Sequence, residues 1–345
     1  MKLARLHPSP WSGHPVYRLM QDYPPDGWII AETNTDCDLT LCQTRPNCDG
    51  LGPWMVLIED WVSLYHPEIS NGCTGNEDVR EHPRTAVLRE RFTKPEFKGI
   101  ICHHRGTFRD LVHLGLTDKL HYLPLGMPRR RAVNFTKAPS CVFTFINSYG
   151  QGSANFYNRG GDMVLRAFHE LWQEGRRDLR LRFICALPDD LDPLLTKWAW
   201  QCPDVTVKMQ HLDDAEFLTE VEIGDCLLLP SHRVHSHSIL LAMSYGLPVI
   251  TSDGWGHDEY VIDGVNGYRI PGSWGWMTGH KDVMREDYSQ AIIVRDLMVA
   301  GLKSYMVQLA DDRALLARLG RNAYDYVNDV HSVERMQRAM GQILG

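Results

Sequence analysis

The sequence lacks the features that mark several large classes of protein. None of its apolar runs approaches the roughly 20 residues of a membrane-spanning helix. Its first residues, MKLARLHPSPW, have no long apolar core, so we expect no secretory signal there. It shows no internal repeat and no low-complexity segment. We therefore do not expect a membrane-spanning protein, a secreted precursor or a repeat protein.

An excess of positive charge is also missing. The chain has 36 Lys and Arg against 43 Asp and Glu, a formal net charge of −7. Such a balance disfavours non-specific attraction to phosphate backbones, so we expect no nucleic-acid partner.

The nine cysteines lack CxxC pairs. Cys102, Cys185 and Cys226 fall inside apolar runs, where a free cysteine behaves as a small hydrophobic residue. Reduced thiols are therefore favoured over a disulfide framework, which fits a cytoplasmic location.

What is present favours two α/β domains. The chain has 345 residues, 43% of them hydrophobic, which is enough for two packed cores. Short apolar runs alternate with helical patterns, and this alternation is typical of a largely parallel sheet. In the first part the expected strands are 2–6, 28–31, 39–42, 54–58, 99–102 and 120–123. Helical patterns lie at residues 76–92 and 107–114. A second series of strands begins at residues 141–146, and the tail has three expected helices, at residues 290–309, 312–319 and 321–344.

A polar, proline-containing stretch separates the two series. It includes Arg129, Arg130 and Arg131, which could touch an acidic acceptor or a membrane surface. The alternative interpretation is a solvated linker.

Residues 225–271 carry the most informative pattern. An apolar strand ends at Pro230 and Ser231, a helical segment ends at Gly246, and a second strand leads into SDGWGHDEY, which we interpret as a flexible polar loop. Ligands of parallel sheets bind at the carboxyl ends of strands, so we expect a site at these two loops.

This stretch resembles the nucleotide-sugar-binding segment of the GT-B glycosyltransferases, and in particular the retaining family 4. The matching residues are Pro230-Ser231, Ala242-Met243-Ser244, Gly246, Pro248-Val249-Ile250, Gly256, Glu259, Val261, Asp263-Gly264 and Asn266-Gly267. The resemblance implies two Rossmann-like domains with a cleft between them. The implied boundaries are 1–128 for an acceptor domain, 129–140 for a linker and 141–325 for a donor domain. Residues 326–345 would form a helix that packs back on the first domain.

The resemblance also implies an activity. Such an enzyme would move a sugar from a nucleotide-sugar donor to a saccharide, lipid-linked or small-molecule acceptor, with retention and without a metal or other cofactor. It would act in the cytoplasm, with peripheral contact at the inner face of a membrane as an option. A catalytically inactive sugar-nucleotide or glycan-binding module stays open as the alternative, and so does a phosphorylase-like or epimerase-like enzyme. The oligomeric state is not indicated.

Several residues follow as candidates from the resemblance. Arg159 takes the place of the family's diphosphate-binding lysine, and arginine suits a diphosphate through its planar fork of donors. The other candidates for binding the donor are Gly13, Ser236, His237, Ser238, Gly256 and Glu259, where a cap on a short helix is the structural alternative for Glu259. His237 is also a catalytic candidate. Asp60 could orient or deprotonate the acceptor hydroxyl, and an N-cap is its structural alternative.

The sequence departs from the family where its two glutamates should stand. Their positions hold Arg233 and Leu241. Leucine cannot hydrogen-bond a ribose, whereas Arg233 could pair with a carboxylated sugar or with the diphosphate, which makes it a further catalytic candidate. His235 or His237 could supply a substitute group. The spacing of His232, His235 and His237 also permits a metal site, which His211 or His257 could join. The family needs no metal, so none is expected.

Overall fold

The computed structural model divides the chain into two compact units. One comprises Met1–Met127, Gly275–Ala291 and His331–Gly345, and the other Pro128–Trp274 and Ile292–Val330. We call them the N-terminal and the C-terminal unit. The structure describes all residues except 8–14, 33–35, 44–51, 66–78, 131–132, 136–139, 148–152, 275–276, 280–283 and 287–291.

A parallel six-stranded sheet forms the centre of the N-terminal unit. Its strand order is β2-β1-β3-β4-β5-β6. The inner strand β4 is buried along its whole length, as expected for a strand covered on both faces. The strands are β1 (Lys2–Leu6), β2 (Trp28–Ala31), β3 (Leu39–Gln43), β4 (Trp54–Ile58), β5 (Phe97–Cys102) and β6 (Leu120–Tyr122).

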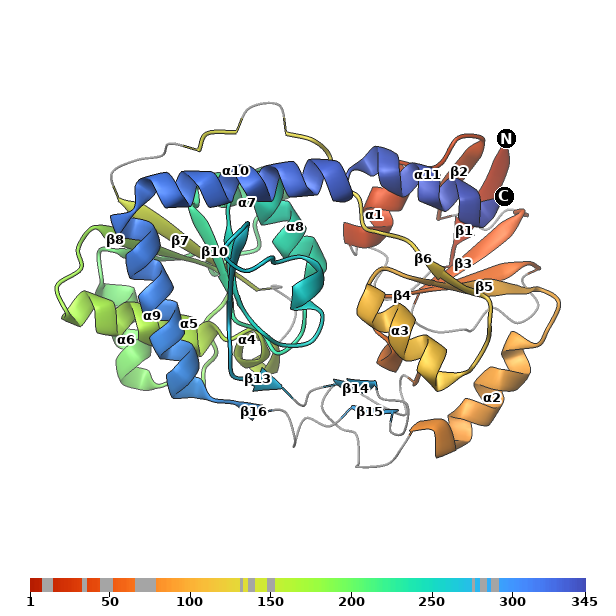
Figure 1. Cartoon of the computed structure of the whole chain (residues 1–345), viewed down its shortest axis with the longest axis horizontal. Coiled ribbons are helices and arrows are strands. Elements are labelled where there is room, and N and C mark those ends of the chain that lie inside the picture. The colour runs from red at the N-terminus through yellow and green to blue at the C-terminus, as the bar shows by residue number, and fades with distance from the viewer. Residues whose placement is uncertain are drawn as a thin grey trace. The chain divides into compact units, whose positions relative to one another are not determined.

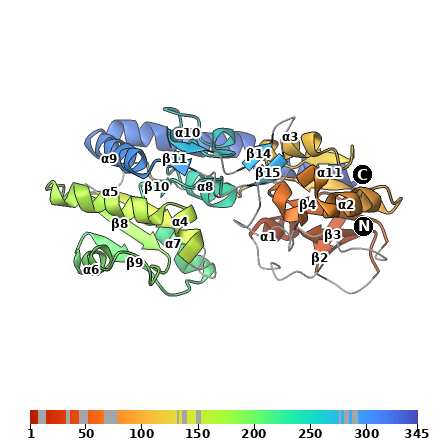
Figure 2. The same cartoon turned by 90° about the horizontal axis from the view of Figure 1, so that it is seen from below.

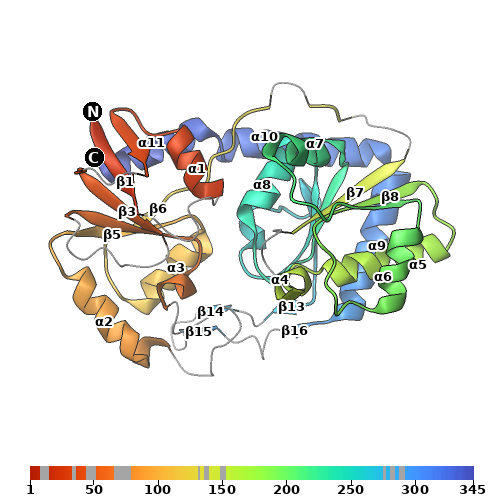
Figure 3. The same cartoon turned by 180° about the vertical axis from the view of Figure 1, so that it is seen from behind.

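Helices cover both faces of this sheet. α1 (Pro15–Asp22) and α11 (Val333–Leu344) lie on one face, and α2 (Pro83–Phe92) and α3 (Arg105–Leu114) on the other (Figures 1 and 3). The C-terminal helix α11 is tied to this unit, since Gln337 donates to the Pro24 carbonyl at 3.0 Å and the Gly126 amide lies 3.3 Å from the Met336 sulfur. The expected return of the chain to its first domain is thus confirmed.

Two local expectations for this unit need correction. A single helix over residues 76–92 was expected, but α2 begins at Pro83, because His82 caps it and a proline fits the first helical position. Cys42 is disulfide-bonded, which contradicts the expectation of reduced thiols. The other cysteines of the described residues are free: Cys37, Cys102, Cys141, Cys185, Cys202 and Cys226.

The C-terminal unit holds a second parallel six-stranded sheet. Its order is β12-β11-β10-β7-β8-β9. The strands are β7 (Cys141–Ile146), β8 (Leu179–Ile184), β9 (Val205–Val207), β10 (Cys226–Leu229), β11 (Val249–Ser252) and β12 (Gly267–Ile270). Two such sheets, each covered by helices, confirm the expected fold class of two Rossmann-like domains.

The helices of this unit follow the direction of the crossovers. The chain moves outward from β7 to β9 and then returns to β10, so right-handed connections place the helices on opposite faces. Accordingly α5 (Gly161–Gln173), α6 (Pro193–Gln201) and α9 (Arg295–Asp311) lie on one face, and α7 (Asp214–Ile223) and α8 (Ser236–Ser244) on the other (Figures 1 and 3). The short helix α4 (Ser153–Asn158) precedes α5.

The tail is divided differently from the expected pattern. A break near Gly320 was expected, but α10 (Arg313–Val330) runs through this glycine and the break comes at His331 and Ser332. A Cβ at residue 320 would lie 2.3 Å from the Gly246 carbonyl oxygen, so glycine serves close packing here. Ser332 then caps α11 by accepting from the Arg335 amide.

Two small antiparallel pairs were not expected from the sequence. They are β13 (Ser273–Trp274) with β16 (Ile292–Ile293), and β14 (Met277–Gly279) with β15 (Met284–Glu286). The second pair belongs to the N-terminal unit although its sequence lies among elements of the other. Among the described residues, no helix is long and apolar enough to cross a membrane.

Arg129 and Arg130 of the linker contact their own unit, and Arg131 lies outside the described residues. Arg130 lies over the ring of Tyr245, 4.6 Å from its centroid, and its carbonyl accepts from the Tyr324 hydroxyl at 2.5 Å. Arg129 donates to the same hydroxyl at 3.4 Å.

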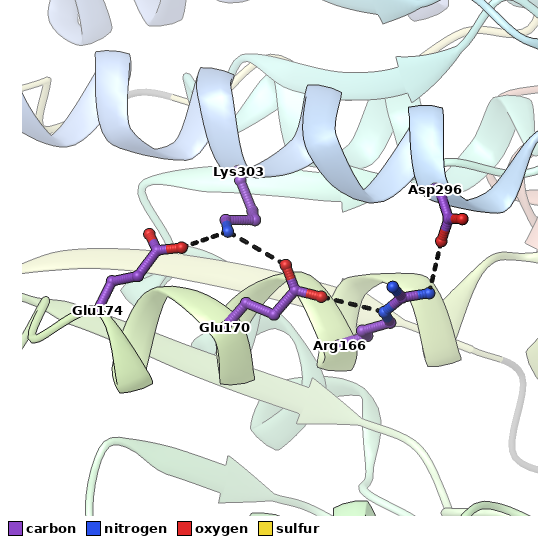
Figure 4. Close-up of polar contacts among 5 residues, drawn as sticks. All are labelled: Arg166, Glu170, Glu174, Asp296 and Lys303. Atoms are coloured by element: carbon purple, nitrogen blue, oxygen red, sulfur yellow. Dashed lines mark hydrogen bonds and ion pairs between the residues drawn. The ribbon is translucent and has the colours of Figure 1, made fainter.

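An ion-pair network joins α5 to α9, which lie next to each other (Figures 2 and 4). Lys303 binds Glu170 at 3.1 Å and Glu174 at 2.5 Å. Arg166 binds Glu170 at 3.0 Å and Asp296 at 2.8 Å. Burial acts to raise the pKa of Glu170, but the hydrogen bonds from Lys303 and Arg166 outweigh it and hold that pKa below its ordinary value.

A buried carboxylate fixes the start of β10. Asp225 is 5% exposed. It accepts from the Val142 amide at 2.8 Å and from the Arg313 guanidinium at 3.4 Å. This residue therefore links β10, β7 and α10.

Removing this carboxylate should destabilise the chain. We expect Asp225→Ala to lower the free energy of unfolding by roughly 2–3 kcal/mol, because it removes one partner of a buried pair. Urea denaturation measures the change. The matched control Asp189→Ala removes an exposed carboxylate and should stay within about 0.5 kcal/mol. Equal stability of the two variants would contradict the structural role of Asp225.

The network between α5 and α9 should contribute a smaller, salt-dependent stability. We expect Lys303→Met to lower the free energy of unfolding by about 0.5–1 kcal/mol at low salt, and less at 1 M salt. Because the folded pKa of Glu170 is lowered, its contribution is present above its ordinary pKa and is lost as the pH falls through the lowered value. The difference from wild type should thus shrink as the pH falls below the ordinary glutamate pKa of about 4.3. Lys197→Met, at an exposed site on α6, is the control, and a salt-independent loss in Lys303→Met would argue for packing instead.

Candidate functional site

The order of strands in the C-terminal unit indicates where a ligand binds. The chain leaves β7 toward β8 and β9 and later returns to β10 on the other side of β7. The connections after β7 and β10 therefore diverge to opposite faces and leave a crevice at the carboxyl ends of these strands. Asn147 follows β7 there, and Pro230 and Ser231 follow β10.

Arg159 lies at this point. Its side chain is 6% exposed and donates to the carbonyl of Ile146, the last residue of β7, at 3.2 Å. The neighbouring Asn158 carbonyl accepts from the His232 amide at 3.2 Å. Gly160 has φ 79°, and a Cβ there would lie 2.8 Å from the Pro230 carbonyl oxygen. The turn that carries Arg159 is thus held against the loop after β10.

The loop after β10 also contacts the loop after β11. The Trp255 amide donates to the His232 carbonyl at 3.0 Å, and the Val234 amide to the Trp255 carbonyl at 2.9 Å. Glycine is needed on both sides of Trp255. A Cβ at residue 254 would lie 2.1 Å from the His232 carbonyl oxygen, and one at residue 256 would lie 2.8 Å from the Val234 side chain.

A buried histidine joins the same two loops. His257 has no exposed surface, and its ring nitrogens lie 2.7 Å from the Thr251 hydroxyl and 3.1 Å from the Ser231 carbonyl. Burial lowers the pKa of His257 to about 3, so its ring is neutral at physiological pH. Tyr260 is fully buried as well. Residues 252–260 are therefore a packed segment, in contrast to the flexible polar loop that the sequence suggested.

Helix α8 follows directly on the loop after β10, and this loop is bonded to the turn that carries Arg159. Its first residues are the predicted Ser236, His237 and Ser238, and its N-cap His235 makes no side-chain capping bond. The first-turn N–H groups of a helix point out of its N-terminal end, where its dipole favours an anion. Leu241 lies further along α8 and is 5% exposed, so it packs in the core.

Arg233 and Trp255 are paired through their backbones. They form an isolated parallel β-bridge. Both side chains are partly exposed, whereas Val234 between the two loops is buried. Arg233 is held further by its carbonyl, which accepts from the Ser231 hydroxyl at 2.7 Å.

Gly256 and Glu259 lie at the two ends of the one-turn helix η3 (His257–Glu259). Gly256 is its N-cap, with φ 79° and no side-chain capping bond. Glu259 is its last residue, half-buried, and its carbonyl accepts from the Tyr326 hydroxyl at 2.6 Å.

The remaining candidates lie elsewhere. Asp60 belongs to the N-terminal unit and is buried, and one of its carboxylate oxygens accepts from both the amide and the hydroxyl of Ser63, at 3.0 and 2.9 Å. It therefore caps the 3-10 helix η1 (Trp61–Tyr65), which was its structural alternative. Gly13 lies outside the described residues.

The histidine run forms no metal centre in the described part of the chain. There, no group of three or more His, Cys, Asp or Glu side chains could hold a metal ion. Burial lowers the pKa of His232 to about 4, so this ring is neutral as well.

Sequence reasoning brought together the residues on the loops and on α8, but it missed His257 and Trp255. His257 was considered only as an additional metal ligand. Its contacts to Ser231 and Thr251 span up to 26 residues and leave no local pattern. For Trp255, two flanking glycines were the one available signal, because they mark a backbone in close contact.

A comparison with family models supports the assignment of this unit. Residues 151–276 match the family described as glycosyl transferases group 1. No curated protein matches the chain.

Solved structures share the fold of the whole chain at low sequence identity. HepE from Anabaena, crystallised with UDP and glucose, is 13% identical with a TM-score of 0.65, and the match covers 100% of this chain and 99% of HepE. WaaG, a glycosyltransferase of lipopolysaccharide biosynthesis, is 14% identical with a TM-score of 0.64 and coverages of 99% and 100%.

A mutant of TarM from S. aureus, crystallised with Fondaparinux, alpha-GlcNAc-glycerol and UDP, is 12% identical with a TM-score of 0.59. The match covers 89% of this chain and 55% of TarM, so the chain spans about half of that protein. At these identities the likeness is one of fold. The fold is that of the GT-B glycosyltransferases, and residues 151–276 match the model of the glycosyl transferases group 1 family.

Proposed function

We propose that this protein is a glycosyltransferase that binds a UDP-sugar in its C-terminal unit and transfers the sugar to a hydroxyl group. The main observation that supports this proposal is the position of Arg159. Its guanidinium lies at the end of β7, and its turn is bonded to the loop that leads into α8. A cation and a helix N-terminus at one crevice form a site for a diphosphate. We choose UDP because HepE and TarM were each crystallised with it.

The reaction breaks the bond between the anomeric carbon and the diphosphate oxygen, and the electron pair leaves with UDP. A new bond forms between that carbon and the acceptor oxygen, whose proton passes to the departing diphosphate. Negative charge grows on the diphosphate during this step, so the same groups that bind it also lower the barrier. Arg159 supplies a fixed cation, and the first turn of α8, with Ser236, His237 and Ser238, supplies N–H donors.

The acceptor and the stereochemistry rest on the family resemblance. We propose transfer with retention of anomeric configuration to a saccharide, lipid-linked or small-molecule acceptor. Glu259 is assigned to the donor, as a partner for hydroxyl groups, because it is half-buried at the end of the loop after β11. Asp60 is not part of this assignment, since its carboxylate caps η1.

A second candidate function is a binding module without transferase activity. The replacement of the family's second glutamate by Leu241 favours it, because the side chain at this position is buried and apolar. Binding of UDP-sugars without turnover, across acceptors of all three classes, would select this candidate.

Arg159 provides the direct test of the proposed donor site. UDP at a hundred times its dissociation constant should stabilise the wild-type fold by about 2.7 kcal/mol, visible as a thermal shift. We expect Arg159→Ala to raise the Kd for UDP about tenfold or more, because a charge-assisted contact is lost. Arg159→Lys, which keeps the charge but not the fork, should retain part of the affinity.

The control is Arg318→Ala, which removes an exposed arginine from α10. It should bind UDP like the wild type. GDP, ADP and dTDP should shift the wild type less than UDP does. Unchanged UDP affinity in Arg159→Ala would remove Arg159 from the site, and no shift with UDP in the wild type would contradict the proposed donor.

A further inference from the structure

Arg233 and Trp255 lie on the two loops that follow β10 and β11, beside the proposed diphosphate site. Arg233 comes three residues before Ser236, the first residue of α8, on the loop whose His232 amide is bonded to Asn158. The diphosphate site proposed above lies between this loop and Arg159. A group joined to the diphosphate and still within the C-terminal unit would therefore meet the loops after β10 and β11.

The backbone pairing places the two side chains on the same side. Residues paired across parallel strands project to the same face, and neighbours along a strand alternate. Val234 projects toward the Gly256 side and is buried. Arg233 and Trp255 consequently project away from that packed contact, side by side, in agreement with their partial exposure.

The loop cannot readily rearrange to move this pair. Side chains at residues 254 and 256 would collide with the 232–234 backbone and with Val234, and His257 holds Ser231 and Thr251 from beneath. The backbone that carries Arg233 and Trp255 is therefore held in place by its own packing.

Its chemistry fits a sugar that carries a carboxylate. A guanidinium binds a carboxylate through two parallel N–H donors. An indole ring presents a flat apolar face on which the C–H groups of a pyranose can pack. Burial keeps the nearby rings of His232 and His257 neutral by lowering the pKa of each, so neither supplies a cation beside Arg233.

We propose that Arg233 and Trp255 select a nucleotide-activated hexuronate, with Arg233 binding the C6 carboxylate and Trp255 packing against the sugar ring. This inference rests on the donor site proposed above. It goes further by assigning a class of sugar and a role to each residue.

UDP-glucose and UDP-glucuronate provide a matched pair of probes, because they differ only in the group at C6. Isothermal titration calorimetry on the full chain should give a Kd for UDP-glucuronate about tenfold or more below that for UDP-glucose. Arg233→Gln should bring this ratio close to one, and Arg233→Lys should give an intermediate ratio. Trp255→Ala should weaken both UDP-sugars relative to UDP.

Arg89→Gln is the matched control, at an exposed position on α2, and should keep the wild-type ratio. A wild-type ratio near one, with UDP itself bound, would overturn the hexuronate inference alone and leave the donor site standing. An equal loss of affinity for UDP and UDP-glucuronate in Arg233→Gln would also overturn it, by assigning Arg233 to the diphosphate. Failure of UDP to bind the wild type would instead overturn the proposed function, and the inference with it.

Discussion

The contact between the loop after β10 and the loop after β11 is the constraint on which the candidate site depends. It is made by backbone groups of residues 232, 234 and 255, and it is possible only because residues 254 and 256 have no side chains. His257 supports it from the buried side, through neutral hydrogen bonds to Ser231 and Thr251. A neutral ring costs far less to bury than a charged one, which explains why a histidine can serve as a core residue here.

This contact also positions the chain segments that carry Arg159 and Arg233. The loop after β10 reaches the turn of Arg159 through the bond from the His232 amide to the Asn158 carbonyl. Three chain segments, after β7, β10 and β11, are therefore fixed to one another by backbone bonds before any side chain of the site is considered. Different side chains at positions 159 and 233 can therefore select different ligands while the backbone of the three segments stays the same, as one fold serves many chemistries.

Most of the fold could be predicted from the sequence, because buried parallel strands appear as apolar runs between turn residues. The strand at residues 141–146 was predicted with the bounds that the structure shows. The errors occurred where tertiary contacts override local pattern. Gly320 indicated a helix end, but it is the point where α10 packs on the Gly246 carbonyl. The strands β13 to β16 have only two or three residues each, too few for a period to be read.

The site was predictable to the extent that its chemistry is local in sequence. Arg159 and the first residues of α8 could be named from the family resemblance. The structure places Arg159 at the end of β7, and α8 begins after the loop that follows β10. Asp60 could not be assigned from the sequence, since a carboxylate after a strand suits a cap as well as a catalytic base, and only the structure shows its bonds to Ser63. Trp255 could not be found because its pairing with Arg233 joins residues 22 positions apart.

Leu241 and Arg233, which stand where the family has its two glutamates, differ in burial and in charge. Together they change the charge of the site. Leu241 is buried and replaces a carboxylate with an apolar group, so one negative charge is lost. Arg233 is partly exposed and replaces another carboxylate with a cation. Relative to the family pattern the site thus changes by three units of charge toward positive, beside a helix N-terminus that is itself electropositive. This added charge is the reason for proposing an anionic sugar over a neutral one, because an anionic sugar offsets it.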